Sequence, residues 1–179
     1  MSAHKPLEGV KVVELASFVA APTAGRMMAE MGADVIRVES TAGDPWRFYG
    51  ANCGLPITDE ENPLFDIYNL GKKDIQLNTK TPEGKEILFH LLDEADVFIT
   101  KNRLKSLVRS GLDYESLKDR FPKLIYGLVT GYGQTGPDVD APGYDGVAFF
   151  SRSGMLADMA EPSGYPASAP GCIGDGATG

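Results

Sequence analysis

The stretch Leu7–Glu39, LEGVKVVELASFVAAPTAGRMMAEMGADVIRVE, decides the fold of this chain. Within it, an apolar run over residues 9–15 begins at a glycine and predicts a buried strand. After a loop, Pro22 begins a helix, where its missing N–H leaves no hydrogen bond unmade. Gly32 predicts a left-handed end to that helix, and a second strand follows over residues 35–39. Strand, helix and strand form a βαβ unit, whose strands should run parallel through a right-handed crossover.

The turn after the first strand, beside the helix N-terminus, is where such folds bind phosphates. A dinucleotide fingerprint, G-x-G-x-x-G, places glycines where the backbone approaches a pyrophosphate. Here residues 16–22 are ASFVAAP, with Phe18 and Val19 where the first glycines would stand. Glu39 stands where a ribose-binding acid would end the second strand, but one acid is weak support. The stretch therefore predicts a Rossmann-like frame with a non-standard turn, rather than a NAD or FAD site.

Strand and helix patterns continue to alternate after this stretch. Further strands are expected at 74–77, 96–99 and 124–129, the last two of them in the core. Helices are expected at 63–70, 81–92, 103–110 and after 113. Asn62, Thr81 and Asp113 are the expected N-caps, because their side chains can accept a hydrogen bond from the first turn. Residues 40–62 are long for an unstructured connection, so they are either functional or an excursion around the domain. The alternation predicts an α/β fold with a doubly wound, mostly parallel sheet.

Composition and charge exclude several classes of protein. At 179 residues the chain is one domain or part of a larger one, and its 42% of hydrophobic residues can form a core. The formal charge of −8 argues against a nucleic-acid surface, which needs clustered Lys and Arg. No window approaches the roughly 18 apolar residues of a membrane span, and the start shows no signal-peptide core. We therefore expect a reduced, cytoplasmic, soluble protein that binds neither nucleic acid nor membrane.

The cysteines and histidines predict no metal site. Cys53 and Cys172 are too few and too isolated for a disulfide framework or a zinc site. His4 and His90 add no ligand spacing to them. We therefore expect both cysteines to take no part in the chemistry.

Asp175 is the sharpest candidate for chemistry in the C-terminal part, where glycine, proline and alanine dominate. It begins what should be a strand exit or a helix entry, with no element after it to pack there. Gly174 and Gly176 would let the backbone adopt unusual conformations and expose N–H groups. A carboxylate in such a turn can attack an activated carbonyl while N–H groups hold the developing oxyanion. A simple surface turn explains the same residues, so both interpretations remain open.

Basic residues and one further acid are the other candidates. The basic side chains that could bind phosphates are Lys72, Lys73, Lys101, Arg103, Lys105 and Arg109. A solvated basic face explains this set equally well. The pair Tyr144–Asp145 marks either an acid near a site or the start of a short helix near 147–152.

Several stretches occur in a fixed order across nearly the whole chain. They are KPLEGVKVVEL at 5–15, GADVIRVE at 32–39, KTPEGK at 80–85, GYGQTGP at 131–137, PGYD at 142–145 and GD at 174–175. Together they resemble the family III CoA-transferases, of the CaiB/BaiF type. Each motif alone is weak, but their common order makes the match specific. The likeness is greatest to the branch that acts on (R)-2-hydroxy acids such as 2-hydroxyisocaproate and phenyllactate.

The resemblance assigns roles to individual positions. It implies that Asp175 is the catalytic aspartate, which forms anhydride and aspartyl-CoA thioester intermediates. It places the contacts to CoA at Val19, Ala20, Leu77, Asn78, Thr79, Lys80, Lys101, Asn102, Arg103, Arg109 and Tyr144. Two positions depart from the family pattern. Ser40 replaces a basic residue that is usual for the adenine end, and Lys101 replaces a usual Asn, with Asn102 next.

The resemblance further implies an enzyme that moves CoA between an acyl-CoA and an (R)-2-hydroxy carboxylate in amino-acid fermentation. CoA and acyl-CoA would bind as substrates, with no permanently bound cofactor and no metal. Residues 1–179 would form the N-terminal part of the large CoA-binding domain, without the second domain or the returning C-terminal part, and the complete protein would be a homodimer. The isolated chain is expected to be poorly active or insoluble, because an unfinished parallel sheet exposes its edges.

Two alternative functions differ from this expectation in a recognisable way. An acyl-CoA racemase of the same fold family needs a His before the Asp at Tyr144–Asp145, and this chain has none there. A module that binds CoA or a nucleotide without turnover would form no covalent adduct on Asp175. The resemblance therefore favours the transferase, and a trapped aspartyl adduct would separate it from the module.

Overall fold

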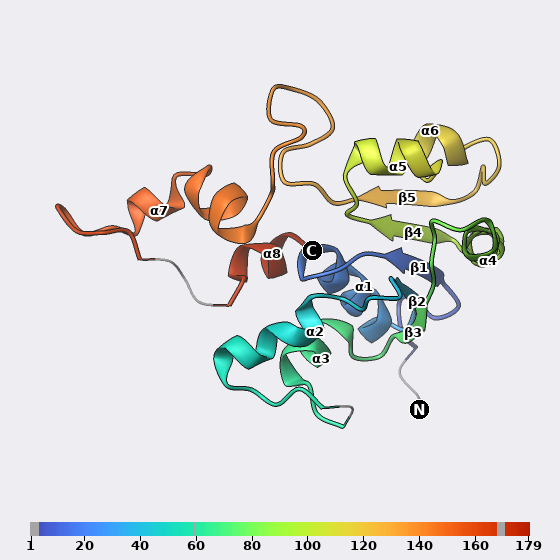
Figure 1. The fold of residues 1–179 in the computed structure, drawn as a ribbon, viewed down its shortest axis with the longest axis horizontal. Helices are drawn as coiled ribbons and strands as arrows, with labels where there is room; N and C mark the ends of the chain where they lie inside the picture. Colours follow the sequence, from blue (N-terminus) through green and yellow to red (C-terminus); the bar gives the residue numbers. More distant parts are fainter. Residues whose placement is uncertain (1–3, 59, 168–170) are drawn as a thin grey trace.

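The computed structural model describes residues 4–58, 60–167 and 171–179, and its centre is a five-stranded parallel sheet (Figure 1). The strands are β1 (Lys11–Leu15), β2 (Asp34–Glu39), β3 (Lys73–Gln76), β4 (Val97–Thr100) and β5 (Ile125–Leu128). Their order in the sheet is β3-β2-β1-β4-β5, and each neighbouring pair is parallel. The predicted doubly wound α/β fold is confirmed. The chain order reverses between β1 and β4, where such sheets open a crevice for ligands.

Helices connect the strands, and three of them begin where the sequence predicts caps. They are α1 (Ala20–Glu30), α2 (Trp46–Tyr49), α3 (Pro63–Asn69), α4 (Pro82–Asp93), α5 (Leu104–Ser110), α6 (Tyr114–Leu117), α7 (Met155–Asp158) and α8 (Ile173–Thr178), with a 3-10 helix at Gly50–Cys53 and a π-helix at Asp145–Ser151. The side chains of Asn62, Thr81 and Asp113 accept backbone N–H groups in the first turns of α3, α4 and α6. These bonds satisfy donors that a helix start leaves open, which confirms the predicted N-caps.

The helices cover both faces of the sheet (Figure 1). α4, α5 and α6 lie over the cluster Val13, Leu15, Val38, Leu88, Leu92, Phe98, Leu107, Leu112, Leu117 and Phe121. α1 covers the opposite face, where its Ala21 packs with Val12 and Val35. Successive strand residues point to opposite faces, so Val12 and Val13 of β1 pack in the clusters on opposite sides of the sheet. Since β1 is buried on both sides, its carboxyl end is held in a rigid frame.

Arg37 of β2 is a fully buried cation surrounded by acids. In the strand register it lies opposite Glu14 of β1 and Asp74 of β3. Its guanidinium is 3.5 Å from the carboxylate of Glu14 and 2.8 Å from that of Asp74. Glu39, at 2.5 Å, and Asp44 complete the set of carboxylates. An ionic row therefore crosses three strands on the face that α1 covers.

Two further cations join this row. Arg47 pairs with Glu39 at 2.8 Å, and the buried ammonium of Lys72 pairs with Glu14 at 2.8 Å. Burial acts to raise the pKa of Glu39, but hydrogen bonds from Arg47 and from the Asp44 N–H lower it to about 2. Because Arg37 and Arg47 occupy its carboxylate, Glu39 is not available to a ribose.

The same pairings correct a sequence interpretation. Lys72 and Lys73 are candidates for phosphate binding by sequence, but Lys72 is buried against Glu14. Lys73 pairs with Asp34 at 2.7 Å on the edge strand β3. Neither lysine lines a cleft at the carboxyl edge of the sheet.

Asp44 connects Arg37 to the turn between β1 and α1, because its carboxylate binds both. Its carboxylate accepts the backbone N–H of Phe18 at 3.1 Å and that of Trp46 at 2.9 Å. Phe18 has a φ of +64°, a left-handed conformation that an aromatic residue rarely adopts. The hydrogen bond from Phe18 to a buried, ion-paired carboxylate stabilises this conformation.

The structure corrects one predicted helix start and one predicted strand environment, and it shows short helices in the long connection over 40–62. α1 begins at Ala20, two residues before Pro22, because Val19 rather than the proline is its N-cap. The connection over 40–62 contains α2 and the 3-10 helix, with Trp46 buried against Phe65. The strand at 124–129 was expected in the core, but β5 is an edge strand whose Ile125 is 65% exposed, since nothing in the described chain covers that side.

No helix within the described ranges has the length and apolar character required to cross a membrane. The described residues also contain no group of three His, Cys, Asp or Glu side chains placed to hold a metal ion.

Replacing Arg37 should destabilise the protein strongly. In Arg37→Met the buried carboxylates lose their central cation, and breaking a buried ion pair from one side costs about 3–5 kcal/mol. Urea unfolding of the variant and the wild type measures this loss of free energy of unfolding.

Lys73→Met is the matched control on the same sheet. Its pair with Asp34 is largely exposed, and such pairs contribute about 1 kcal/mol or less. Equal losses in the two variants would contradict a special role for Arg37.

Candidate active site

Two joined clefts open at the carboxyl edge of the sheet. The first, which we call the α5 cleft, has a volume of about 710 Å³. It is lined by the residues that follow β1, β2, β3 and β4, together with Lys80, Lys85 and Arg109. None of these three cations makes an ion pair within the described chain. The α5 cleft therefore combines the reversal point of the sheet with free positive charge, which suits an anionic ligand.

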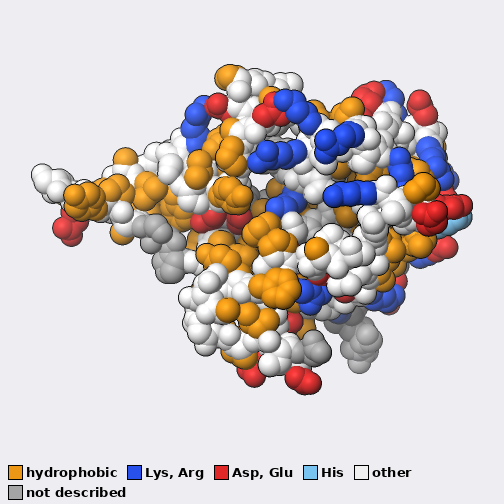
Figure 2. Space-filling view, in the orientation of Figure 1, with side chains coloured by type: hydrophobic (Ala, Val, Ile, Leu, Met, Phe, Trp, Pro, Cys, Tyr) orange, Lys and Arg blue, Asp and Glu red, His pale blue; other side chains and the backbone are white. Residues whose placement is uncertain are grey.

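The second cleft, which we call the α8 cleft, has a volume of about 1210 Å³. It shares Ser17 and Asn102 with the α5 cleft, so the two are continuous. Its walls include Val19 and Ala20 at the start of α1, and Asp175 of α8. Figure 2 shows Lys and Arg side chains gathered around a hollow next to α5.

Asp175 reaches this cleft because the chain leaves the sheet after β5 and returns (Figure 1). α8 packs against α1, and the N–H of Asp175 donates to Asp145 Oδ1 at 2.7 Å. Of the two alternatives left open by the sequence, a strand exit or a helix entry, the structure shows a helix entry, with Asp175 in the first turn of α8. Burial raises the pKa of the Asp175 carboxyl, the charge of Asp145 raises it further, and Lys101 acts in the opposite direction. A half-buried carboxylate beside another acid is a more basic and less hydrated nucleophile than a surface aspartate.

The glycines beside Asp175 have a different purpose from the one the sequence suggests. Neither Gly174 nor Gly176 has a positive φ, so unusual backbone conformation does not explain them. A Cβ on Gly174 would overlap the ring of Phe149, whereas a Cβ on Gly176 would meet nothing within 4 Å. Gly174 thus permits the close approach of α8 to the π-helix that carries Phe149. The left-handed residue at this helix start is Cys172, with φ of +53°.

Aromatic side chains form one wall of the α8 cleft. The rings of Trp46 and Tyr49 stack with centroids 4.6 Å apart, and the ring of Phe18 lies 6.3 Å from Trp46. All three line the cleft. The non-glycine turn at Phe18 therefore contributes apolar surface where a dinucleotide fingerprint would have bare backbone.

The structure divides the predicted site residues between the two clefts. Leu77, Thr79, Lys80 and Arg109 line the α5 cleft; Val19, Ala20, Lys101, Arg103, Tyr144 and Asp175 line the α8 cleft; Asn102 lines both. Asn78 lines neither, and its side chain accepts the Lys80 N–H at 3.2 Å within the turn after β3. Ser40 lines the α5 cleft and donates to the Gly43 carbonyl at 3.2 Å.

Further polar residues at the clefts are not among the predicted site residues. Lys85 lines the α5 cleft from α4, and its only sequence signal is its place in KTPEGK. Asp44 lines it as well and supports the Phe18 turn, which no local pattern reveals.

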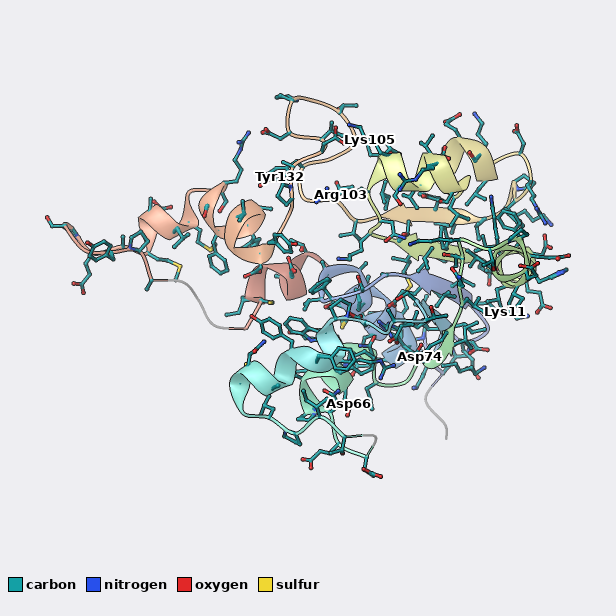
Figure 3. All side chains as sticks on the ribbon, in the orientation of Figure 1. Lys11, Asp66, Asp74, Arg103, Lys105 and Tyr132 are labelled. Atoms are coloured by element: carbon teal, nitrogen blue, oxygen red, sulfur yellow. The ribbon has the colours of Figure 1, made fainter. Side chains whose placement is uncertain are left out.

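Figure 3 shows Arg103 and Lys105 at the start of α5, beside the loop that carries Tyr132. Lys105 pairs there with Asp140 at 2.5 Å.

The thiol nearest to the candidate nucleophile is a poor nucleophile itself. Cys172 lines the α8 cleft and packs beside Trp46 and Phe65. Burial raises the pKa of its thiol, and the charges of Asp145 and Asp175 act in the same direction. The protonated form is therefore favoured, whereas thiol reactivity requires the thiolate.

Comparison with known proteins gives one consistent family. Residues 7–179 match the description CoA-transferase family III. The chain is 49% identical over 167 residues to a cinnamoyl-CoA:phenyllactate CoA-transferase of Clostridium sporogenes, covering 93% of this chain and 40% of that protein. It is 44% identical over 169 residues to an (R)-2-hydroxy-4-methylpentanoate CoA-transferase of Clostridioides difficile, covering 94% and 42% respectively.

A solved structure agrees with these sequence matches. The crystal structure of a CAIB/BAIF family protein from Brucella suis superposes with a TM-score of 0.88 at 39% identity. The match covers 96% of this chain and 45% of that chain. The chain thus spans about two fifths of the length of the curated relatives described above.

The two glycines beside Asp175 should respond differently to substitution. Gly174→Ala forces a methyl group into the ring of Phe149, and such overpacking costs about 1–3 kcal/mol. Gly176→Ala adds a methyl group in open space and gains helix propensity of up to about 1 kcal/mol. Thermal unfolding of both variants checks this order of stability, and a more stable Gly174→Ala would refute it.

Removing the charge of Asp145 should lower the pKa of Asp175. Asp145→Asn keeps an oxygen that can accept the Asp175 N–H but removes a charge that raises this pKa. Asp175 should then stay ionised to lower pH than in the wild type, although burial keeps acting to raise its pKa. Carbon-13 NMR titration of labelled aspartates measures the shift, with Asp175→Asn identifying the resonance.

The control for this titration is Asp138→Asn. Asp138 is an acid paired with Arg152 at 2.6 Å and lines neither cleft. It should leave the Asp175 resonance unchanged. A pKa of Asp175 that is unaltered or higher in Asp145→Asn would contradict the proposed coupling.

Proposed function

This chain belongs to CoA-transferase family III, and from that premise we propose that the complete protein moves CoA between an acyl-CoA and an (R)-2-hydroxy carboxylate. The two relatives described above are named for phenyllactate and for (R)-2-hydroxy-4-methylpentanoate, both of them 2-hydroxy acids. The aromatic wall of the α8 cleft is compatible with the apolar side chains of such acids.

One observation carries the proposal: Asp175 lies half-buried in a cleft that continues into a second, cation-lined cleft. An acyl-CoA has the same two parts, a thioester at one end and a phosphate-bearing nucleotide at the other. Holding the nucleotide end in the α5 cleft would keep the thioester close to Asp175, which raises its effective concentration.

The first half of the proposed reaction loads CoA onto Asp175. A carboxylate oxygen of Asp175 attacks the thioester carbonyl carbon, the C–S bond breaks, and CoA leaves as a thiolate. The product is a mixed anhydride between Asp175 and the acyl group. The thiolate then attacks the aspartyl carbonyl carbon, and the donor acid leaves as a carboxylate. Asp175 now carries CoA as a thioester.

The second half runs the same steps in reverse with the acceptor. A carboxylate oxygen of the 2-hydroxy acid attacks the aspartyl thioester carbon and displaces the CoA thiolate. The thiolate attacks the acceptor's carbonyl carbon in the new anhydride, which frees Asp175 and forms the new acyl-CoA. Each step exchanges one acyl bond for another, so no net proton or electron transfer is required. Partial burial of Asp175 assists by limiting hydration of the attacking carboxylate.

We assign the phosphates of CoA to Lys80, Lys85 and Arg109, because charge-assisted hydrogen bonds to phosphate are strong and these cations are free in the described chain. The pantetheine arm would pass Ser17 and Asn102, where the clefts join. It would then reach Val19 and Ala20 at the N-terminus of α1, whose partial positive charge favours a thiolate or oxyanion.

Other parts of the proposal rest on the family resemblance. Residues 1–179 would be the N-terminal part of the large CoA-binding domain of a homodimer that works in amino-acid fermentation. A racemase is disfavoured because neither His4 nor His90 lines the clefts of the described chain. A CoA-binding module without turnover is the remaining alternative, and the adduct experiment below tests it.

Asp175→Ala in the complete protein should abolish transfer while leaving CoA affinity within a few-fold. The variant loses the nucleophile but keeps the cations of the α5 cleft, so turnover should fall by at least about 10³-fold. An assay with acyl-CoA and (R)-2-hydroxy-4-methylpentanoate or (R)-phenyllactate measures transfer, and calorimetry measures CoA binding. Asp158→Ala, which removes an acid that lines neither cleft, should retain wild-type rates.

Adduct trapping separates the enzyme from a binding module. Hydroxylamine added with acyl-CoA should convert the aspartyl thioester to a hydroxamate, found on Asp175 by peptide mass spectrometry. Undiminished turnover in Asp175→Ala, or CoA binding without any adduct in the wild type, would reject the proposed mechanism.

A further inference from the structure

Lys101 is held rigidly at the wall of the α8 cleft, directly after β4. The hydroxyl of the buried Thr100 donates to the Leu15 carbonyl at 2.9 Å, and the Asn102 N–H donates to the Thr100 hydroxyl at 3.2 Å. These bonds fix the backbone on both sides of Lys101. Its ammonium lies 4.4 Å from the centre of the Phe18 ring, and a cation over an aromatic face is attracted to it.

No carboxylate of the described residues forms an ion pair with this ammonium. The nearby Asp44 is already engaged by Arg37 and by two backbone N–H groups. Burial lowers the pKa of Lys101, while the charges of Asp44 and Asp175 act to raise it. Lys101 is therefore a partly desolvated cation with a π contact, open to the cleft and without a fixed anionic partner.

In the proposed function a carboxylate substrate enters the α8 cleft, where a cation would offset the negative charge of the cleft's own acids. Both Asp145 and Asp175 line the cleft, and like charges repel an approaching carboxylate. Arg103, the other cation that lines the cleft, is an exposed residue. Lys101 is half-buried and lines the same wall as the aromatic ring of Phe18, where an apolar acyl chain can pack.

We propose that Lys101 binds the carboxylate of the 2-hydroxy acid in the α8 cleft and holds it beside Asp175, an assignment that rests on the proposed function. In the proposed reaction the donor acid leaves as a free carboxylate and the acceptor acid enters as one, so the same cation can contact a carboxylate in both halves of the reaction.

Lys101 lies outside the cleft to whose cations we assign the phosphates of CoA. The α5 cleft has three cations of its own, and Lys101 does not line it. The variants of Lys101 should therefore change acid binding and spare CoA binding. That difference distinguishes the proposal from a general role in holding the nucleotide.

The test is calorimetric binding to the complete protein, with CoA and with (R)-2-hydroxy-4-methylpentanoate in the presence of saturating CoA. Lys101→Met should weaken acid binding by about 10- to 100-fold, the range expected for loss of a hydrogen bond to a charged group. Lys101→Arg should restore most of the affinity. The uncharged primary amide of the acid should bind the wild type and Lys101→Met alike.

Lys118→Met is the control for lost surface charge, because Lys118 pairs with Glu115 and lines neither cleft. It should leave acid and CoA binding unchanged. Steady-state kinetics should show the same pattern, with KM for the acid raised in Lys101→Met and KM for acyl-CoA unaltered.

The outcomes separate this proposal from the proposed function. Unchanged acid binding in Lys101→Met, or a loss confined to CoA binding, would overturn the role of Lys101 even if transfer occurs. A shifted pH profile with unaltered acid affinity would instead make Lys101 a partner of Asp175 and also overturn it. If the wild type transfers no CoA but acid binding still depends on Lys101, the proposed function fails and the Lys101 site stands.

Discussion

The buried guanidinium of Arg37 is the constraint on which the rest of the site depends. It lies in register between Glu14 and Asp74, so it ties three parallel strands together on one face. Through Asp44 it also determines the conformation of Phe18 in the turn after β1. A buried charge is tolerated only with its partners in place, so these side chains have few alternative positions. The turn at Phe18 is rigid for the same reason, because Asp44 binds its backbone.

The candidate active site combines this rigid edge with a segment that arrives from far along the chain. The sheet edge provides the α5 cleft, the start of α1 and the ammonium of Lys101. The segment after β5 leaves the sheet and returns as α8, which packs against α1 and brings Asp175 to the same place (Figure 1). In the proposed function, one part would hold the nucleotide while the other presents Asp175.

Much of this molecule follows from local sequence signals. Alternating strand and helix patterns predict the parallel sheet, since their periodicity reflects burial of one face or two. Capping side chains such as Thr81 and Asp113 indicate helix starts, because the hydrogen bonds they make are local. Short motifs, among them the glycine-flanked Asp175, predict a candidate nucleophile.

The tertiary structure decided the surroundings of individual side chains, because these depend on residues that are distant in sequence. Lys72 and Lys101 are equally basic in sequence, but one is buried against Glu14 and the other opens into the α8 cleft. Gly174 is needed for the approach of Phe149, not for a special φ. The sequence by itself determined the parallel α/β frame and indicated Asp175 as a candidate nucleophile, because both signals come from neighbours along the chain. Packing alone determines which charged side chains pair within the protein and which remain available to a ligand. The reason is that Coulomb interactions depend on distance and burial in space.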